Sequence, residues 1–179
     1  MGALRGRSLG GIVLALGVLL APAETNAYPK PAYVNPVALG LRHQSDAHRR
    51  DASAEIHCLA LNVYHEARSE PDDGKFAVAQ VTLNRVRSPR YPDGVCKVVW
   101  QRGQFSWTRD GRSDWPHNRR AWERALWVAT VAYHFNPLSL VGDATHYHAV
   151  YVRPFWQRAH RRVSRIGRHV FYEASKRRS

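Results

Sequence analysis

Cysteine, methionine and acidic residues are scarce in this sequence of 179 residues. It contains 2 cysteines, 1 methionine and 14 acidic residues, against 27 lysines and arginines. Two cysteines are too few for a disulfide-dense mini-protein or for a four-cysteine zinc site. The net charge of +13 indicates a polyanionic partner, either a nucleic acid, an anionic membrane surface or an acidic cell-wall polymer. Composition alone does not choose among the three.

Long hydrophobic runs are also missing. The apolar run at residues 9–21 has 13 residues, whereas a membrane-spanning helix needs about 20. Arg5 and Arg7 precede this run and small residues follow it at 21–23 and 25–27, which is the pattern of a cleaved secretory signal. We therefore predict a signal peptide over residues 1–27 and an exported chain, with an uncleaved membrane anchor as the alternative.

Export changes what the cysteines and the charge imply. Cys58 and Cys96 can form a disulfide in an oxidising envelope compartment, and an even cysteine count favours that pairing over two buried free thiols. A nucleic-acid partner becomes less suitable, because little nucleic acid lies outside the membrane.

The remaining chain divides into an arm, a folded domain and a basic tail. Residues 28–50 contain three prolines and no periodic pattern, which is typical of a linker or flexible arm. The folded domain is predicted over 51–173 and the tail over 174–179.

Apolar spacing predicts helices from Asp51 or Ser53 to Ser69, from Asp72 to Ser88 and from Trp122 to Asn136. Alternating residues predict strands at 144–152 and 169–172, whereas 91–100 reads as a turn with an apolar stretch and 104–116 as a loop. This order indicates an α+β fold with a small antiparallel sheet. The arginine-dense stretch 158–178 is interpreted as a solvated helix face with a frayed end, or as an adhesive surface for an anionic envelope polymer.

Glu66 stands out among the acidic residues. Leu59, Asn62, Val63 and Glu66 lie along one side of the first helix, so the carboxyl is at the edge of the apolar face and near the helix C-terminus. Burial there disfavours the charged form and raises the pKa, as a general acid near neutral pH requires. The alternative is an ion pair with Arg68, Arg85 or another arginine.

Four aromatic residues surround a polar segment in the predicted loop. Flat rings beside amide and hydroxyl groups suit the binding of sugar rings, although the same rings could fill a small core. The cluster consists of Trp100, Phe105, Trp107 and Trp115 around Gln101, Gln104 and Ser106.

Metal and nucleophile motifs are incomplete. His65-Glu66 begins like the zinc motif H-E-x-x-H, but position 69 is serine. His146 and His148 share one face of a predicted strand, yet a zinc site needs a third ligand. The sequence also has no G-x-S-x-G nucleophile elbow.

The segment from Cys58 to Glu70, CLALNVYHEARSE, resembles a signature of the bacterial cell-wall hydrolases related to spore cortex-lytic enzymes. Five further blocks agree in order, so the resemblance covers roughly residues 55–172. These blocks are Val78-Ala79-Gln80-Val81 with Asn84-Arg85-Val86; Tyr91-Pro92 with Val95-Cys96; Gln104-Phe105-Ser106-Trp107; 144–148 with Val152, Pro154 and Trp156; and 166–169 with Phe171-Tyr172.

The resemblance implies a lysozyme-like or lytic-transglycosylase-like fold, peptidoglycan as the substrate and Glu66 as a single catalytic acid and base. No metal or other cofactor is then required. It also implies a substrate groove, for which we name Gln104, Phe105, Ser106, Trp107, His146 and Tyr147. A lysozyme-type hydrolase would need a second carboxylate, and Glu70 is the nearest in sequence. Ser69 stands where glycine is frequent in the family. The chain as given has no room for the separate wall-binding domain of the spore enzymes, so a role in germination does not follow.

Other functions remain open from the sequence. One is a metal-dependent muramoyl-alanine amidase that uses His146 and His148. Another is a non-catalytic cationic protein that binds the wall. A nucleic-acid binder, whose affinity would fall steeply with salt, is the third.

Overall fold

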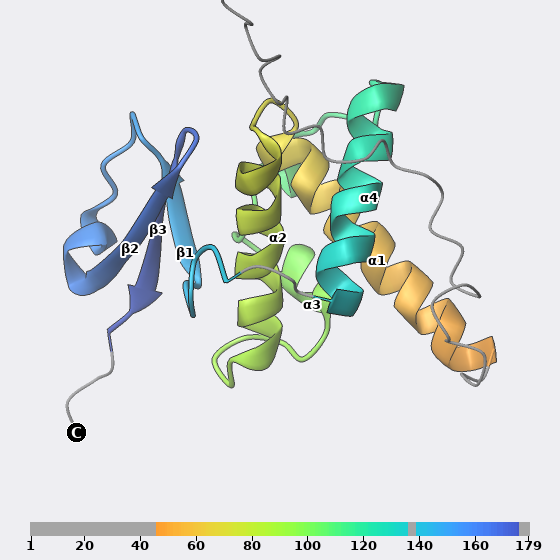
Figure 1. Ribbon diagram of the computed structural model, residues 1–179, viewed down its shortest axis with the longest axis horizontal. Helices are drawn as coiled ribbons and strands as arrows, with labels where there is room; N and C mark the ends of the chain where they lie inside the picture. Colours follow the sequence, from red (N-terminus) through yellow and green to blue (C-terminus); the bar gives the residue numbers. More distant parts are fainter. Residues whose placement is uncertain (1–45, 136–138, 176–179) are drawn as a thin grey trace, which may run out of the picture. The chain divides into compact units, whose positions relative to one another are not determined.

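The computed structural model describes residues 46–135 and 139–175 (Figure 1). The predicted signal peptide, most of the predicted arm and residues 176–179 of the tail lie outside this part. Within it, no helix is long and apolar enough to cross a membrane. The predicted α+β fold is confirmed, because the described residues form four α-helices and one three-stranded antiparallel sheet.

Helix α1, Asp46–Ala67, passes through the helical core. It begins five residues before Asp51, so the end of the predicted arm is helical. Leu59 and Val63, one turn apart, have no exposed surface and face the neighbouring helices. The helix ends at Ala67, and Pro71 disfavours a helical conformation at Glu70, so α1 does not continue into α2.

Helix α2, Asp72–Arg87, agrees with the predicted range. Asp72 and Asp73 lie in its first turn, where negative charge interacts favourably with the helix dipole. Ser88 follows in extended conformation and precedes Pro89, which ends the helix.

The short helix α3, Val95–Val99, was not predicted within the turn and apolar stretch at 91–100. Its first turn is bound to α1, because the Glu55 carboxylate accepts hydrogen bonds from the backbone N–H groups of Val95 and Cys96. The predicted disulfide between Cys58 and Cys96 is confirmed, and it links the same two helices.

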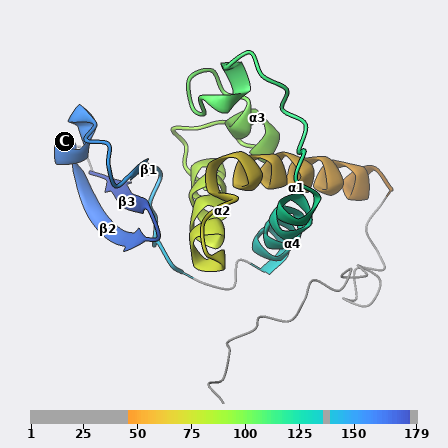
Figure 2. The same cartoon turned by 90° about the horizontal axis from the view of Figure 1, so that it is seen from above.

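Helix α4, Arg119–Phe135, begins three residues before the predicted Trp122. The Asn118 side chain accepts a hydrogen bond from the N–H of Ala121 at 2.9 Å, a typical N-cap. The helices α1, α2 and α4 contact one another (Figure 2), and α3 packs against α1 and α2.

The sheet has the strand order β1-β3-β2, with β1 at His146–Ala149, β2 at His160–Ile166 and β3 at His169–Ala174. Both predicted strands are therefore present, as β1 and β3. Phe171 of β3 packs with Ala77 and Val81 of α2 in a second apolar cluster, which joins the sheet to the helices.

The interpretation of residues 158–178 as a helix face is wrong. The described part of this stretch contains the end of a 3₁₀-helix, η3 (Phe155–Ala159), followed by β2 and β3. The register of β2 shifts between Arg162 and Ser164, so a bulge interrupts the alternation that identifies a strand in sequence.

Polar side chains of α2 hold the segment that leads into β1. The Asn84 amide donates to the carbonyl oxygens of Gly142 and Ala144 at 2.8 and 2.9 Å. The Arg85 Nε donates to the Thr145 carbonyl oxygen at 2.8 Å. These bonds fix β1 relative to α2. They thereby fix the position of Tyr147, the residue of β1 that faces Glu66.

Candidate active site

Glu66 lies in the last turn of α1, and its carboxylate faces β1. The Tyr147 hydroxyl donates a hydrogen bond to Glu66 Oε2 at 3.1 Å. Burial raises the pKa of Glu66 above its usual 4.5, while the Tyr147 hydrogen bond and the Arg85 charge oppose the rise without cancelling it. The pKa of Glu66 is thus raised, in the predicted direction. Within the described residues Glu66 forms no ion pair with Arg68, Arg85 or another arginine.

Tyr147 is positioned as a permanent hydrogen-bond donor. Its ring packs against those of His169 and Phe171, at centroid distances of 5.3 and 5.7 Å. Burial first, and then the Glu66 charge, raise the pKa of Tyr147 well above its usual value. The hydroxyl therefore keeps its proton throughout the pH range in which Glu66 titrates.

Arg85 of α2 is the cation whose charge lowers the pKa of Glu66. It is only 6% exposed, and its guanidinium lies over the rings of Phe105 and Tyr91 at 5.3 and 5.5 Å. One terminal nitrogen, Nη1, is buried without a hydrogen-bond partner among the described residues. The guanidinium thus packs against two aromatic faces, and no carboxylate among the described residues forms an ion pair with it.

Two of the aromatic residues named for the groove are buried. Phe105 is 4% and Trp107 7% exposed. Trp107, in the 3₁₀-helix η2 (Trp107–Arg109), donates from Nε1 to Asn62 Oδ1 at 3.4 Å and stacks on His65 at 4.4 Å. These two rings support the wall of the site, whereas Ser106 is exposed and Gln104 half-buried.

His146 and Tyr147 lie on opposite faces of β1, since side chains alternate along a strand. The His146 ring is 4.4 Å from that of His160 and 5.3 Å from that of Trp156. Burial, then the charge on His160, lowers the pKa of His146 to about 4, so the ring is neutral near pH 7. The two named residues therefore do not line one surface of the strand.

His148, on the same face as His146, shares a hydrogen bond of 3.0 Å with the Tyr172 hydroxyl. Across residues 46–135 and 139–175, no three histidine, cysteine or acidic side chains are grouped closely enough to hold a metal ion. The third ligand that the histidine pair would need is therefore not found in this part.

Glu70, the candidate second carboxylate, forms a structural contact instead. Its carboxylate accepts hydrogen bonds from the backbone N–H and the Nε of Arg168 at 2.9 and 2.8 Å. Burial raises the pKa of Glu70, but these bonds and the Arg168 charge outweigh it, so the net pKa lies below 4.5. This carboxylate connects the end of α1 to the β2–β3 turn.

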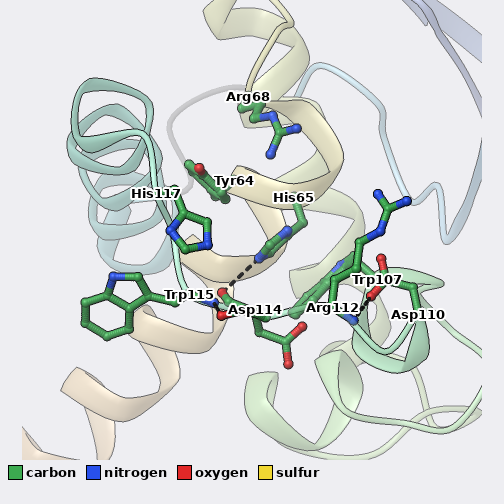
Figure 3. A pocket seen from close by; sticks show the side chains of 10 residues that line it. Tyr64, His65, Arg68, Trp107, Asp110, Arg112, Asp114, Trp115 and His117 are labelled. Atoms are coloured by element: carbon green, nitrogen blue, oxygen red, sulfur yellow. Dashed lines mark hydrogen bonds between the residues drawn. The ribbon is translucent and has the colours of Figure 1, made fainter.

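A hollow of about 390 Å³ opens beside the C-terminal turns of α1 (Figure 3). Its walls come from α1 and from the loop at 107–117. The His65 Nε2 lies 3.0 Å from the Asp114 carbonyl oxygen, and the Tyr64 hydroxyl accepts a hydrogen bond from the Asn118 N–H at 3.0 Å. The lining residues are Tyr64, His65, Arg68, Trp107, Asp110, Arg112, Ser113, Asp114, Trp115 and His117.

The sequence did not predict the contacts that Asn62, His65 and Arg85 make around the site, although Arg85 was considered as an ion-pair partner of Glu66. The Asn84-Arg85-Val86 block contributed to the family resemblance, which was a signal that Arg85 has a specific position. The contacts of Asn62 and His65 with Trp107 span 45 and 42 positions of the chain, and no local pattern shows them.

Comparison with known proteins identifies the family. The model of the cell wall hydrolase family matches residues 69–172, beginning just after Glu66. The spore cortex-lytic enzyme of Bacillus subtilis (strain 168) is 34% identical over 126 residues, which covers 66% of this chain and 37% of that protein. The spore cortex-lytic enzyme of Oceanobacillus iheyensis is 33% identical over 124 residues, covering 65% and 41%. The chain thus spans about two fifths of the length of these curated relatives.

Solved structures agree with this comparison. The catalytic domain of the Bacillus cereus SleB protein has a TM-score of 0.54 and 30% identity, covering 66% of this chain and 89% of that one. The catalytic domain of the germination-specific lytic transglycosylase SleB from Bacillus anthracis has a TM-score of 0.55 and 29% identity, covering 66% and 93%. With the family model matching more than half of its residues, this chain belongs to the cell wall hydrolase family.

Proposed function

We propose that this protein cleaves the glycan strands of peptidoglycan as a lytic transglycosylase, with Glu66 as the single acid and base. The observation that carries the proposal is the Glu66 carboxyl, whose pKa is raised by burial and whose orientation is fixed by the Tyr147 hydroxyl at 3.1 Å. The similarity to spore cortex-lytic enzymes and to a lytic transglycosylase supports the same reaction.

The first step requires Glu66 as an acid. Its proton passes to the glycosidic oxygen that leaves C1 of N-acetylmuramic acid, and the C1–O bond breaks through an oxocarbenium-like state. The Tyr147 hydrogen bond then stabilises the carboxylate that forms. Arg85 acts in the same direction, because its charge favours the ionised Glu66.

In the second step the Glu66 carboxylate acts as a base. It takes the proton of the 6-hydroxyl group of the same sugar while that oxygen bonds to C1, which closes a 1,6-anhydro ring and returns Glu66 to its acid form. No water is consumed and no second carboxylate is needed. The contacts of Glu70 with Arg168 favour this mechanism over one that uses Glu70.

The buried and exposed residues of the 104–107 segment take different roles in this proposal. Gln104 and Ser106 line the substrate groove with Tyr147. The ring of Phe105 packs against Arg85, and the ring of Trp107 stacks on His65. The protein acts outside the cytoplasm in this proposal, in the periplasm or cell envelope, where peptidoglycan lies.

The test is product analysis by mass spectrometry after incubating purified peptidoglycan with the full chain. We expect anhydro-muramyl ends from the wild type and a loss of about a hundredfold or more in rate for Glu66→Gln. Glu123→Gln, which changes an exposed glutamate of α4, is the matched control and should keep full activity. Reducing muramic ends would indicate hydrolysis with a second carboxylate. Free stem peptides, released in a chelator-sensitive reaction, would indicate an amidase, and either result contradicts the proposal.

A further inference from the structure

The hollow beside α1 contains charged side chains that the proposed cleavage does not use. Its lining excludes Glu66, although His65 of the lining is the preceding residue and is rotated from Glu66 by about 100° around the helix axis. The hollow therefore opens next to the proposed reaction centre but not at it. This is where a substituent of the bound strand, rather than the cleaved bond, would be placed.

We propose that this hollow binds the stem peptide of peptidoglycan, so that the enzyme acts on peptide-bearing strands in preference to bare glycan. The inference rests on the proposed function, because it assigns a second part of the same substrate. Stem peptides carry free carboxylates and, on their diamino acid, a free amine. A binding site for them needs cations and anions within one small space.

The lining supplies both signs of charge. Arg68 and Arg112 are exposed cations, and within the described part of the chain neither forms an ion pair with a carboxylate. Arginine binds carboxylates with two parallel hydrogen bonds. Asp110 and Asp114 belong to the same lining. Asp110 Oδ1 already accepts a hydrogen bond from the backbone N–H of Arg112 at 2.9 Å, and a carboxylate has further lone pairs that can accept from an amine.

The scaffold of the hollow is already formed without a ligand. His65 stacks on Trp107 with an interplanar angle of 15° and lies within hydrogen-bond distance of the loop at Asp114. The Tyr64 hydroxyl accepts from Asn118 at the other end of the loop. Preformed walls reduce the entropy lost on binding, which suits recognition of a short flexible peptide.

Trp115 offers a contact surface at the edge of the hollow. Its side chain is 72% exposed, and it belongs to the lining together with His117 (Figure 3). Its flat indole face is available to pack against an apolar part of a bound strand. A sugar ring could stack there too, and its hydroxyl groups can bond to Asp or Arg side chains. An uncharged sugar, however, has no charged group to pair with the arginines and aspartates of the lining, whereas a stem peptide has both carboxylates and an amine, so the lining favours a peptide.

The experiment compares two substrates that differ only in the stem peptide. One is intact peptidoglycan, and the other is the same material after an amidase has removed the peptides. We expect the wild type to have a higher kcat/KM on intact strands. Arg112→Ala and Trp115→Ala should each lower that value about tenfold, with no change on bare strands. Arg109→Ala, which removes an exposed arginine of η2 outside the lining, is the matched control.

Activity of every variant on bare strands shows that it is folded. Equal loss on both substrates would mean a sugar subsite, and no loss on either would mean that the hollow binds nothing in the reaction; both results overturn the inference. A binding measurement separates this failure from failure of the proposed function. Trp fluorescence titration of the Glu66→Gln protein with a disaccharide-peptide and with the bare disaccharide should show tighter binding of the former, and this difference should disappear when Arg112→Ala is added.

Discussion

Breaking the Cys58–Cys96 disulfide should destabilise the fold strongly without changing the site. The bridge spans 38 positions of the chain. In the chain-entropy account, closing a loop of this length in the unfolded chain corresponds to about 4 kcal/mol at 25 °C. For a folded domain of roughly 130 residues, the same free energy lowers Tm by about 15 °C. We expect reduction of the wild type to lower the free energy of unfolding by this amount at most.

The assay is urea unfolding of the oxidised and reduced wild type, followed by circular dichroism. Reduction leaves both sulfur atoms in place, so the packing of the buried Cys58 changes little. The Cys58→Ala/Cys96→Ala variant is the control, and its stability should not respond to the reductant. A difference below about 1 kcal/mol between the oxidised and reduced proteins would contradict a stabilisation of this size by the disulfide.

Three further predictions concern the groups around the site. Tyr147→Phe removes a hydrogen bond that lowers the pKa of Glu66, so the alkaline limb of the pH profile of kcat/KM should move to higher pH; an unmoved limb would show that the contact is not formed in solution. Gly167→Ala should cost about 2 kcal/mol in urea unfolding, because Gly167 has φ +54° and a Cβ there would overlap the Glu70 carboxylate. The Glu70 pKa is lowered on folding, so its contribution to stability is present above 4.5 and is lost as the pH falls through the folded pKa. Glu70→Gln should flatten that acid dependence, and an unchanged slope between neutral pH and acid would contradict the assignment.

Local signals explain which elements could be predicted from the sequence. Helix α2 lies between Asp72-Asp73 and Pro89, and these residues predict its ends directly. Helix α3 has five residues and depends on Glu55 and the disulfide, which are distant in sequence. Strand β2 was missed because exposed arginines and a register shift hide its alternation.

The site was predictable only in part for the same reason. The burial of Glu66 follows from the helical spacing of its neighbours, so the direction of its pKa could be predicted from the sequence. The Tyr147 hydroxyl approaches it from 81 positions away, and only the fold brings the two together. Phe105 and Trp107 were named for the groove, with core packing as the alternative. Both rings are buried, against Arg85 and His65 respectively, and a cluster of aromatic residues in the sequence does not reveal which rings will be buried.

Titration of the Glu66 carboxyl itself tests its role as the catalytic acid most directly. The ¹³C chemical shift of its side-chain carboxyl can be followed by NMR from acid to neutral pH, with Glu66→Gln used to assign the signal. We expect a pKa above 4.5 that coincides with the alkaline limb of kcat/KM on peptidoglycan. A Glu66 pKa at or below 4.5, or a limb that does not follow it, would contradict the assignment of Glu66 as the catalytic acid.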